Sequence, residues 1–176
     1  DIVRAGKALY VGLSRYPLAA ARFAFRYLAQ RDVPCLLFQD RYNLFDREPD
    51  TSGILTLNAE AGAGFVAFSP LAQGLLTDRY LNGIPEGSRM ATEGSLRRDV
   101  LTDRMSERIR GLHEIARQRG QTLAEMALAW LLRDKRVTSV IIGESSVAQI
   151  EDNLRALEHA SFSDDELSRL DALSRP

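Results

Sequence analysis

Four short polar segments each follow directly on an apolar run of the sequence, and they hold the side chains best suited to bind a ligand. These segments are residues 14–16, 39–43, 69–74 and 143–146. Each of them taken alone is typical of a turn. Because ligands in parallel α/β folds bind at the carboxyl ends of the strands, four such segments on one face favour a binding site.

Segment 143–146 joins a predicted strand to the N-terminus of a predicted helix, where free backbone amides and the helix dipole suit a phosphate group. Ser146 and Gln149 have the spacing of a capping box, so a plain helix cap accounts for the segment equally well. One turn further on, Asp152 and Asn153 either reach a base or ribose or belong to the solvated helix surface.

Arg79 and Arg89 flank a segment punctuated by glycine, proline and serine, residues 81–88. Guanidinium groups pair well with phosphate oxygens, although a lone surface arginine needs no such partner. Phe68 ends an apolar run at the mouth of the expected site. Its ring either stacks on a nucleotide base or nicotinamide or packs in the core.

Several other chemistries have no counterpart in the sequence. There is no glycine-rich dinucleotide fingerprint, no Walker loop and no nucleophile elbow. His113 and His159 fall in polar helical stretches and are interpreted as surface residues, and Cys35 as a buried small hydrophobe, so no metal site is expected. The two lysines, Lys7 and Lys135, precede strands and lie on the stabilising face. We therefore assign no catalytic residue.

The composition indicates one globular domain. The 176 residues carry a net charge of −1, with 45% hydrophobic and 27% charged residues, which argues against disorder and against a dedicated nucleic-acid binder. One cysteine excludes an internal disulfide, and no apolar run reaches the roughly 18 residues of a membrane helix. The first residues lack the pattern of a signal peptide. We expect a cytoplasmic protein without membrane or nucleic-acid partners.

The elements that position these residues alternate between strands and helices. Strands are expected at 8–13, 35–38, 64–68 and 138–142, and helices at 18–30, 51–61, 102–119, 123–133 and 147–157. Ser163 and Glu166 form a capping box that opens a last helix. Unbroken apolar strands followed by helices predict a parallel α/β fold.

Four βα units do not close a (β/α)8 barrel, so the fold is either a small open sheet or the second half of something larger. Residues 1–6 favour the second alternative, because they resemble the last turn of a helix with Gly6 as its C-cap. An irregular stretch at 75–101 is typical of a functional or mobile loop.

Motifs in sequence order resemble the aldo-keto reductases over essentially the whole chain. Residues 6–14 resemble the fifth barrel strand of that family, Gln39 with residues 42–44 the sixth, 65–77 the seventh with its loop, and 137–143 the eighth. Segments 82–85, 88–90 and 118–121 resemble the bacterial L-glyceraldehyde 3-phosphate/methylglyoxal reductases, a subgroup similar to potassium-channel β subunits.

The resemblance implies a (β/α)8 TIM barrel of which residues 1–176 form the C-terminal half: the last four βα units, strands 5–8, and the C-terminal helix. It also implies NADPH as the cofactor, reduction of a small aldehyde or ketone, and a homo-oligomer. The family's catalytic Asp, Tyr, Lys and His belong to the first four units and have no counterpart here. The alternative is a non-catalytic NADP(H)-binding half-barrel or a binding and assembly module like a channel β subunit.

The resemblance further implies roles for fifteen residues around NADPH. Those expected near the nicotinamide are Ser14, Arg15, Gln39 and Phe68, with Phe68 stacking on the ring. Those expected at the phosphates are Ser69, Leu71, Gln73 and Gly74 in a pyrophosphate loop, with Arg79 and Arg89 above it. Those expected at the adenosine are Gly143, Ser145 and Gln149 around the 2′-phosphate, and Asp152 and Asn153 at the adenine.

Overall fold

The computed structural model describes residues 1–88, 90–92 and 96–175. Its centre is a parallel sheet of four strands in the order β1-β2-β3-β4. The strands are β1 (Val11–Ser14), β2 (Cys35–Arg41), β3 (Gly64–Phe68) and β4 (Ser139–Ile141). The predicted parallel α/β fold is confirmed, and all four expected strands form near their expected positions.

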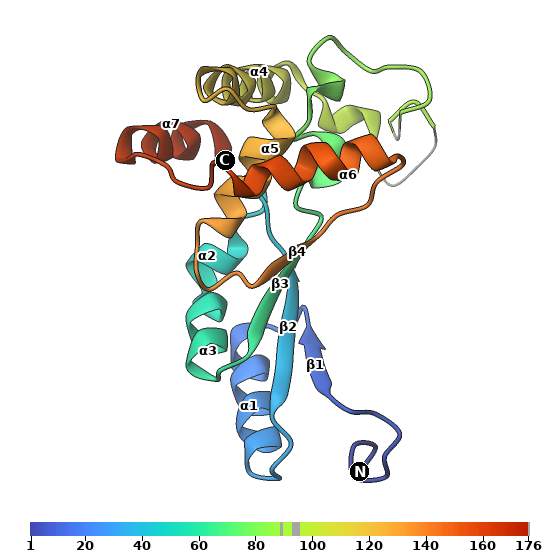
Figure 1. Ribbon diagram of the computed structural model, residues 1–176, viewed down its shortest axis with the longest axis vertical. Coiled ribbons are helices and arrows are strands. Elements are labelled where there is room, and N and C mark those ends of the chain that lie inside the picture. Colours follow the sequence, from blue (N-terminus) through green and yellow to red (C-terminus); the bar gives the residue numbers. More distant parts are fainter. Residues whose placement is uncertain (89, 93–95, 176) are drawn as a thin grey trace.

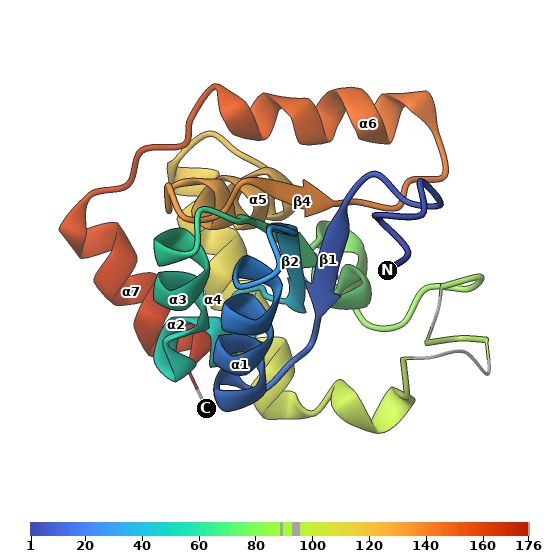
Figure 2. The ribbon, with the colours of Figure 1, turned by 90° about the horizontal axis from the view of Figure 1, so that it is seen from below.

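Helices connect these strands in chain order. They are α1 (Leu18–Ala29), α2 (Glu48–Ser52), α3 (Ile54–Glu60), α4 (Asp103–Gln118), α5 (Leu123–Leu132), α6 (Val147–Leu154) and α7 (Asp164–Ser174). Neighbouring strands are also consecutive in sequence, so right-handed crossovers place their helices on the same face of the sheet. Figures 1 and 2 show α1, α2 and α3 together on that face.

Side chains alternate between the two faces of the sheet. Phe38, Phe65 and Ala67 point toward the helices and are fully buried. The Phe38 ring lies 6.5 Å from Phe25 of α1 and 6.2 Å from Phe65. The neighbouring side chains Gln39 and Val66, which pair across β2 and β3, are only half-buried. The core therefore lies between the sheet and its helices, and the opposite face is open.

Two predicted helices differ from the observed ones. The expected helix at 51–61 is two helices, because Gly53 adopts φ +85° and ends α2 before α3 begins. The expected helix at 147–157 ends as an α-helix at Leu154 and continues as a 3-10 turn, Arg155–Leu157. The capping box of Ser163 and Glu166 forms as predicted at the start of α7.

The first residues form one hydrogen-bonded turn. The Ala5 amide donates to the Asp1 carbonyl over 2.8 Å, and Gly6 has φ +69°, as expected for a glycine at a helix C-cap. Cys35 is buried and His159 exposed, as predicted, whereas His113 is half-buried, with Nδ1 3.1 Å from the Asp78 carboxylate.

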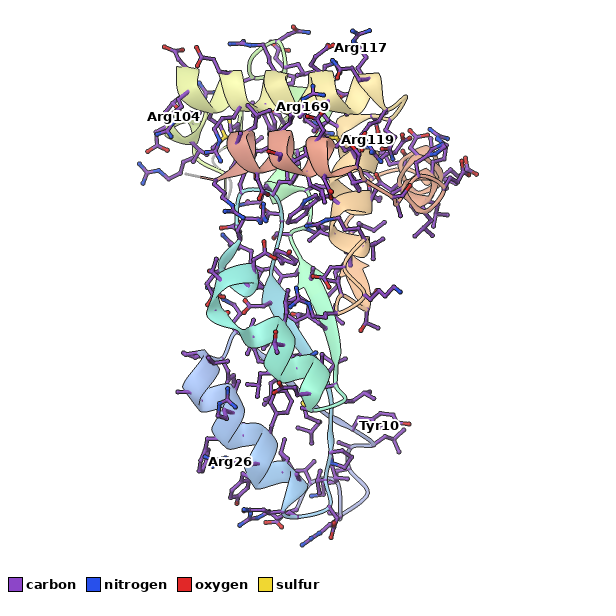
Figure 3. The ribbon with its side chains drawn as sticks, turned by 90° about the vertical axis from the view of Figure 1, so that its left-hand side faces the viewer. Tyr10, Arg26, Arg104, Arg117, Arg119 and Arg169 are labelled. Atoms are coloured by element: carbon purple, nitrogen blue, oxygen red, sulfur yellow. The ribbon has the colours of Figure 1, made fainter. Side chains whose placement is uncertain are left out.

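Arginines join α4 to α7 at the end of the molecule beyond the sheet. Arg119 binds Glu166 over 2.7 Å and its guanidinium lies over the Phe162 ring, while Arg169 donates to Gln118. Figure 3 shows both side chains beside these helices and Tyr10 projecting near the amino end of β1. Within the described residues, no helix is long and apolar enough to span a bilayer, and no three His, Cys, Asp or Glu side chains gather as metal ligands.

Candidate functional site

The predicted binding segments lie together beyond the carboxyl ends of the strands, because all four strands are parallel and adjacent. The carboxyl ends of the strands point toward the half of the molecule that carries α4 to α7 (Figure 1). A cavity of about 430 Å³ opens at this end of the sheet. Seven predicted cofactor residues line it, namely Leu71, Gln73, Gly74, Arg79, Gly143, Ser145 and Gln149.

The loop after β3, residues 69–74, has an unusual backbone. Ser69, Ala72 and Gln73 have φ of 52°, 47° and 58°, and Gly74 has φ of 99°. Non-glycine residues in this region cost on the order of 1–3 kcal/mol each, and such strain concentrates at functional sites. The turn is closed by the Thr77 hydroxyl, which donates to the Gly74 carbonyl over 2.7 Å.

On the other side of the cavity, Ser145 and Gln149 bind each other at the start of α6. The Ser145 amide and hydroxyl donate to the Gln149 side-chain oxygen over 2.9 and 3.0 Å. The Ser146 hydroxyl accepts from the backbone amide of Gln149, as predicted. In a capping box the Gln149 side chain would accept from the backbone amide of Ser146, but here it accepts from that of Ser145. The predicted box is therefore only half correct, and the Gln149 side chain lies at the cavity.

Asn153, one turn further along α6, is buried, so the alternative that placed it on a solvated helix surface is wrong. Its amide donates to the Glu144 carboxylate, which also lines the cavity. Asp152 is exposed and pairs with Arg155. The Asn153 contact holds the acidic side chain of Glu144 against α6.

Arg79 brings a positive charge to the cavity. It lies exposed on a 3-10 turn, Asp78–Tyr80, that the Thr77 hydroxyl caps by accepting from the Arg79 amide. Its predicted partner Arg89 lies outside the described residues. The guanidinium of Arg79 and the strained loop together make this cavity suited to an anionic ligand.

The residues predicted at the nicotinamide lie at the ends of β1, β2 and β3. Ser14 and Gln39 are paired in register, and the Arg15 amide, with φ 57°, donates to the Gln39 carbonyl over 3.0 Å. Phe68 is half-buried on the open face, where the Arg41 guanidinium lies 5.9 Å from its ring centre. It is not part of the buried core, which favours the stacking interpretation.

A second cavity, of about 340 Å³, lies beside the ends of β1 and β2. Arg15, Asp40 and Arg41 are among the residues that line it. Burial raises the pKa of the Asp40 carboxyl, while the Arg41 amide and the charges of Arg15 and Arg41 oppose that shift. Of the residues expected at the nicotinamide, Arg15 borders this second cavity, whereas Ser14, Gln39 and Phe68 line neither of the two.

Three residues of this region received no role of their own in the sequence analysis, although Asn43 and Glu144 belong to the predicted segments 39–43 and 143–146. Thr77 and Glu144 line the first cavity, and Asn43 is a fully buried side chain that donates to the Ser69 carbonyl over 2.9 Å. A threonine ahead of a short helix is a recognisable cap, so Thr77 had a local signal. The contact of Asn43 with Ser69 had no such signal, because the two residues lie 26 positions apart in sequence.

The parallel sheet carries its helices on one face, and a cavity suited to an anion lies at the carboxyl ends of its strands. This arrangement is typical of a ligand-binding α/β barrel protein. Residues 1–175 match the Aldo/keto reductase family, and the chain belongs to this family.

Two relatives and one solved structure define its similarity. The chain is 47% identical over 173 residues to the L-glyceraldehyde 3-phosphate reductase of Escherichia coli (strain K12), covering 96% of this chain and 50% of that protein. It is 35% identical over 161 residues to a probable voltage-gated potassium channel subunit beta of Oryza sativa subsp. japonica, covering 89% and 49%. The thermostable aldo-keto reductase Tm1743, crystallised with the inhibitor epalrestat, matches with a TM-score of 0.69 and 27% identity, over 98% of this chain and 51% of that one.

The chain spans about half the length of these relatives. The aldo-keto reductase fold is of the (β/α)8 type, and the four parallel strands with their helices correspond to part of such a barrel. The family and the fold class expected from the sequence are thereby confirmed.

Proposed function

We propose that residues 1–176 are the C-terminal, NADPH-binding half of a barrel that reduces small aldehydes of the methylglyoxal or L-glyceraldehyde 3-phosphate type. The cavity at the carboxyl ends of the strands carries this proposal, because seven residues expected at the cofactor line it together. The similarity to a protein named L-glyceraldehyde 3-phosphate reductase supports the substrate class.

The residues present fit the chemistry of a dinucleotide phosphate. The Arg79 guanidinium supplies positive charge, and Ser145 and Gln149 supply a hydroxyl and an amide at the N-terminus of α6. At Gly143 no atom lies within 4 Å of the position that a Cβ would take, so the backbone there is accessible to a ligand. The Glu144 carboxylate also lines the cavity, and the Asn153 amide donates to it.

The chain's own part in the reaction is to bind and orient the cofactor. NADPH, when bound, supplies a hydride to a carbonyl carbon. Ser14 and Gln39 would hold the carboxamide, and the Phe68 ring would support one face of the nicotinamide. We propose no proton donor within these residues, so protonation of the carbonyl oxygen belongs to the first half of the barrel.

The experiment that tests this function is a calorimetric titration of the purified protein with NADPH and with NADH. We expect saturable binding with a preference for NADPH, and we expect NADPH-dependent reduction of methylglyoxal by the polypeptide that carries a whole barrel. Absence of NADPH binding would contradict the proposed role of this half. NADPH binding without reduction of methylglyoxal by the whole barrel would contradict the reductase activity and favour the second candidate function, described next.

That second candidate is a non-catalytic NADP(H)-binding or assembly module. Its support is a pair of edge strands, β1 and β4, together with several exposed apolar side chains. Tyr10 before β1 is 67% exposed, Phe23 of α1 is 62% exposed and Leu154 of α6 is 56% exposed. Exposed edges and apolar side chains favour association with another polypeptide. Size measurement of the purified protein, alone and with NADPH, distinguishes a monomer from such an assembly.

A further inference from the structure

Asn43, just beyond the end of β2, has a fully satisfied side-chain amide in a fully buried position. Its oxygen accepts from the backbone amides of Phe45 and Asp46, each over 2.9 Å. Its nitrogen donates to the Asp46 carboxylate over 3.1 Å and to the Ser69 carbonyl over 2.9 Å. The side chain therefore joins the turn after β2 to the first residue of the loop after β3.

Ser69 is the residue at which that loop leaves the sheet. Its carbonyl accepts the Asn43 amide and also the Ala72 backbone amide, over 3.0 Å. The same six residues hold three non-glycine residues at positive φ. Because such backbone persists only where surrounding contacts determine it, the loop needs an external anchor. Asn43 provides a buried one at the start of the loop.

We propose that Asn43 is a positioning residue for the cofactor: it holds loop 69–74 in the conformation that presents its backbone to the pyrophosphate. The proposal rests on the proposed function, since it assigns the loop to NADPH. Asn43 itself is fully buried and does not line the cavity, so it acts through Ser69. Its loss is expected to weaken binding of a ligand that needs the loop and to spare one that needs only α6.

The chain offers a matched control at the opposite end of β3. Asn58 of α3 is 1% exposed, and its amide donates to the Ala63 carbonyl, just before β3, over 2.6 Å. Both asparagines thus donate from a buried position to a main-chain carbonyl that flanks the same strand. They differ in which end of the strand they hold.

The test compares Asn43→Ser and Asn58→Ser in three measurements: the Kd for NADPH, the Kd for adenosine 2′-monophosphate, and hydrogen exchange of the amides in loop 69–74. For Asn43→Ser we expect about tenfold weaker NADPH binding and faster exchange in the loop. Binding of adenosine 2′-monophosphate, which reaches only the Ser145 side, stays within about twofold. For Asn58→Ser we expect a lower Tm with both Kd values and the loop exchange unchanged.

Three results would overturn the proposal: wild-type NADPH affinity in Asn43→Ser, equal weakening of both ligands, or unchanged exchange in the loop. Exchange is read without ligand, so it tests the positioning even if the wild-type protein binds no NADPH, a result that defeats only the proposed function. If Asn43→Ser does not fold, Asp46→Ser replaces it, since Asp46 orients the same amide nitrogen. We then expect about threefold weaker NADPH binding and faster loop exchange, and no change in either contradicts the proposal.

Discussion

The two ends of the sheet are built differently. Among the described residues, five non-glycine residues have positive φ, and four of them, Arg15, Ser69, Ala72 and Gln73, follow the carboxyl ends of β1 and β3. The fifth, Asp32, lies before β2, and short polar side chains of this kind tolerate the left-handed region. Before β3 the same conformation is taken by Gly62.

This difference distinguishes the end of the sheet that we propose binds a ligand from the end that only connects helices to strands. At the amino ends the chain turns with residues that adopt the required backbone at little cost. At the carboxyl ends it accepts strain in four non-glycine residues, two of which, Arg15 and Gln73, line a cavity. Because such strain concentrates at functional sites, it supports our proposal that this end of the sheet binds a ligand.

The largest expected effect comes from placing a β-branched side chain at each end. Gly74 has φ +99°, and a Cβ at this position would lie 3.5 Å from the ring of the buried Tyr80. For Gly74→Val we therefore expect at least tenfold weaker NADPH binding and a loss of about 2 kcal/mol in the free energy of unfolding. Calorimetric titration and urea unfolding measure the two quantities.

Its control is Gly62→Val before β3, where φ is +68° and no atom lies within 4 Å of a Cβ. We expect a loss of about 1 kcal/mol in stability and an unchanged Kd for NADPH. Equal effects of the two variants on the Kd would remove the distinction between the ends.

A smaller effect is expected from removing positive charge. Arg79→Ala loses the guanidinium at the cavity, and we expect about fivefold weaker NADPH binding at low ionic strength and a smaller loss at 0.5 M salt, since salt screens exposed charges. Arg136→Ala, in the turn before β4, is the control and leaves the Kd unchanged. A salt-independent Kd in the wild-type protein would show that charge does not contribute.

The smallest effects concern two aspartates at opposite ends. Burial raises the pKa of Asp40 at the carboxyl end of β2, whereas hydrogen bonds from Arg136 lower the pKa of Asp134 before β4. Because the pKa of Asp40 is higher in the folded protein than in the unfolded chain, the free energy of unfolding decreases as the pH rises above the unfolded-state pKa of about 3.9. We therefore expect Asp40→Asn to raise the free energy of unfolding by a few tenths of a kcal/mol at pH 7.

For Asp134 the sign is opposite. Its lowered pKa contributes stability above a pH of about 4 that disappears as the pH falls through the folded-state value, so Asp134→Asn loses a few tenths of a kcal/mol at pH 7. Tm measured for both variants from pH 3 to 7 checks the two signs. A stabilising Asp134→Asn would contradict the assignment of its ion pair with Arg136.

Much of this architecture could be predicted from sequence. The strands are unbroken apolar runs, and the polar segments after them lie at one edge because parallel strands share their direction. Gly53 was hidden inside a helical pattern that continues on both sides of it. Gln149 has two nearby serines to bind, and spacing alone does not choose between them. Asn43 depends on a contact between two strand ends, which only the fold brings together.

We propose that the carboxyl end of the sheet binds NADPH. The most direct measurement is an NMR titration of the backbone amides with NADPH. We predict that the largest shifts fall at residues 14–15, 39, 69–79 and 143–149, with little change at 62–64 and 134–138. Shifts concentrated at the amino end, or none on addition of saturating NADPH, would contradict the account.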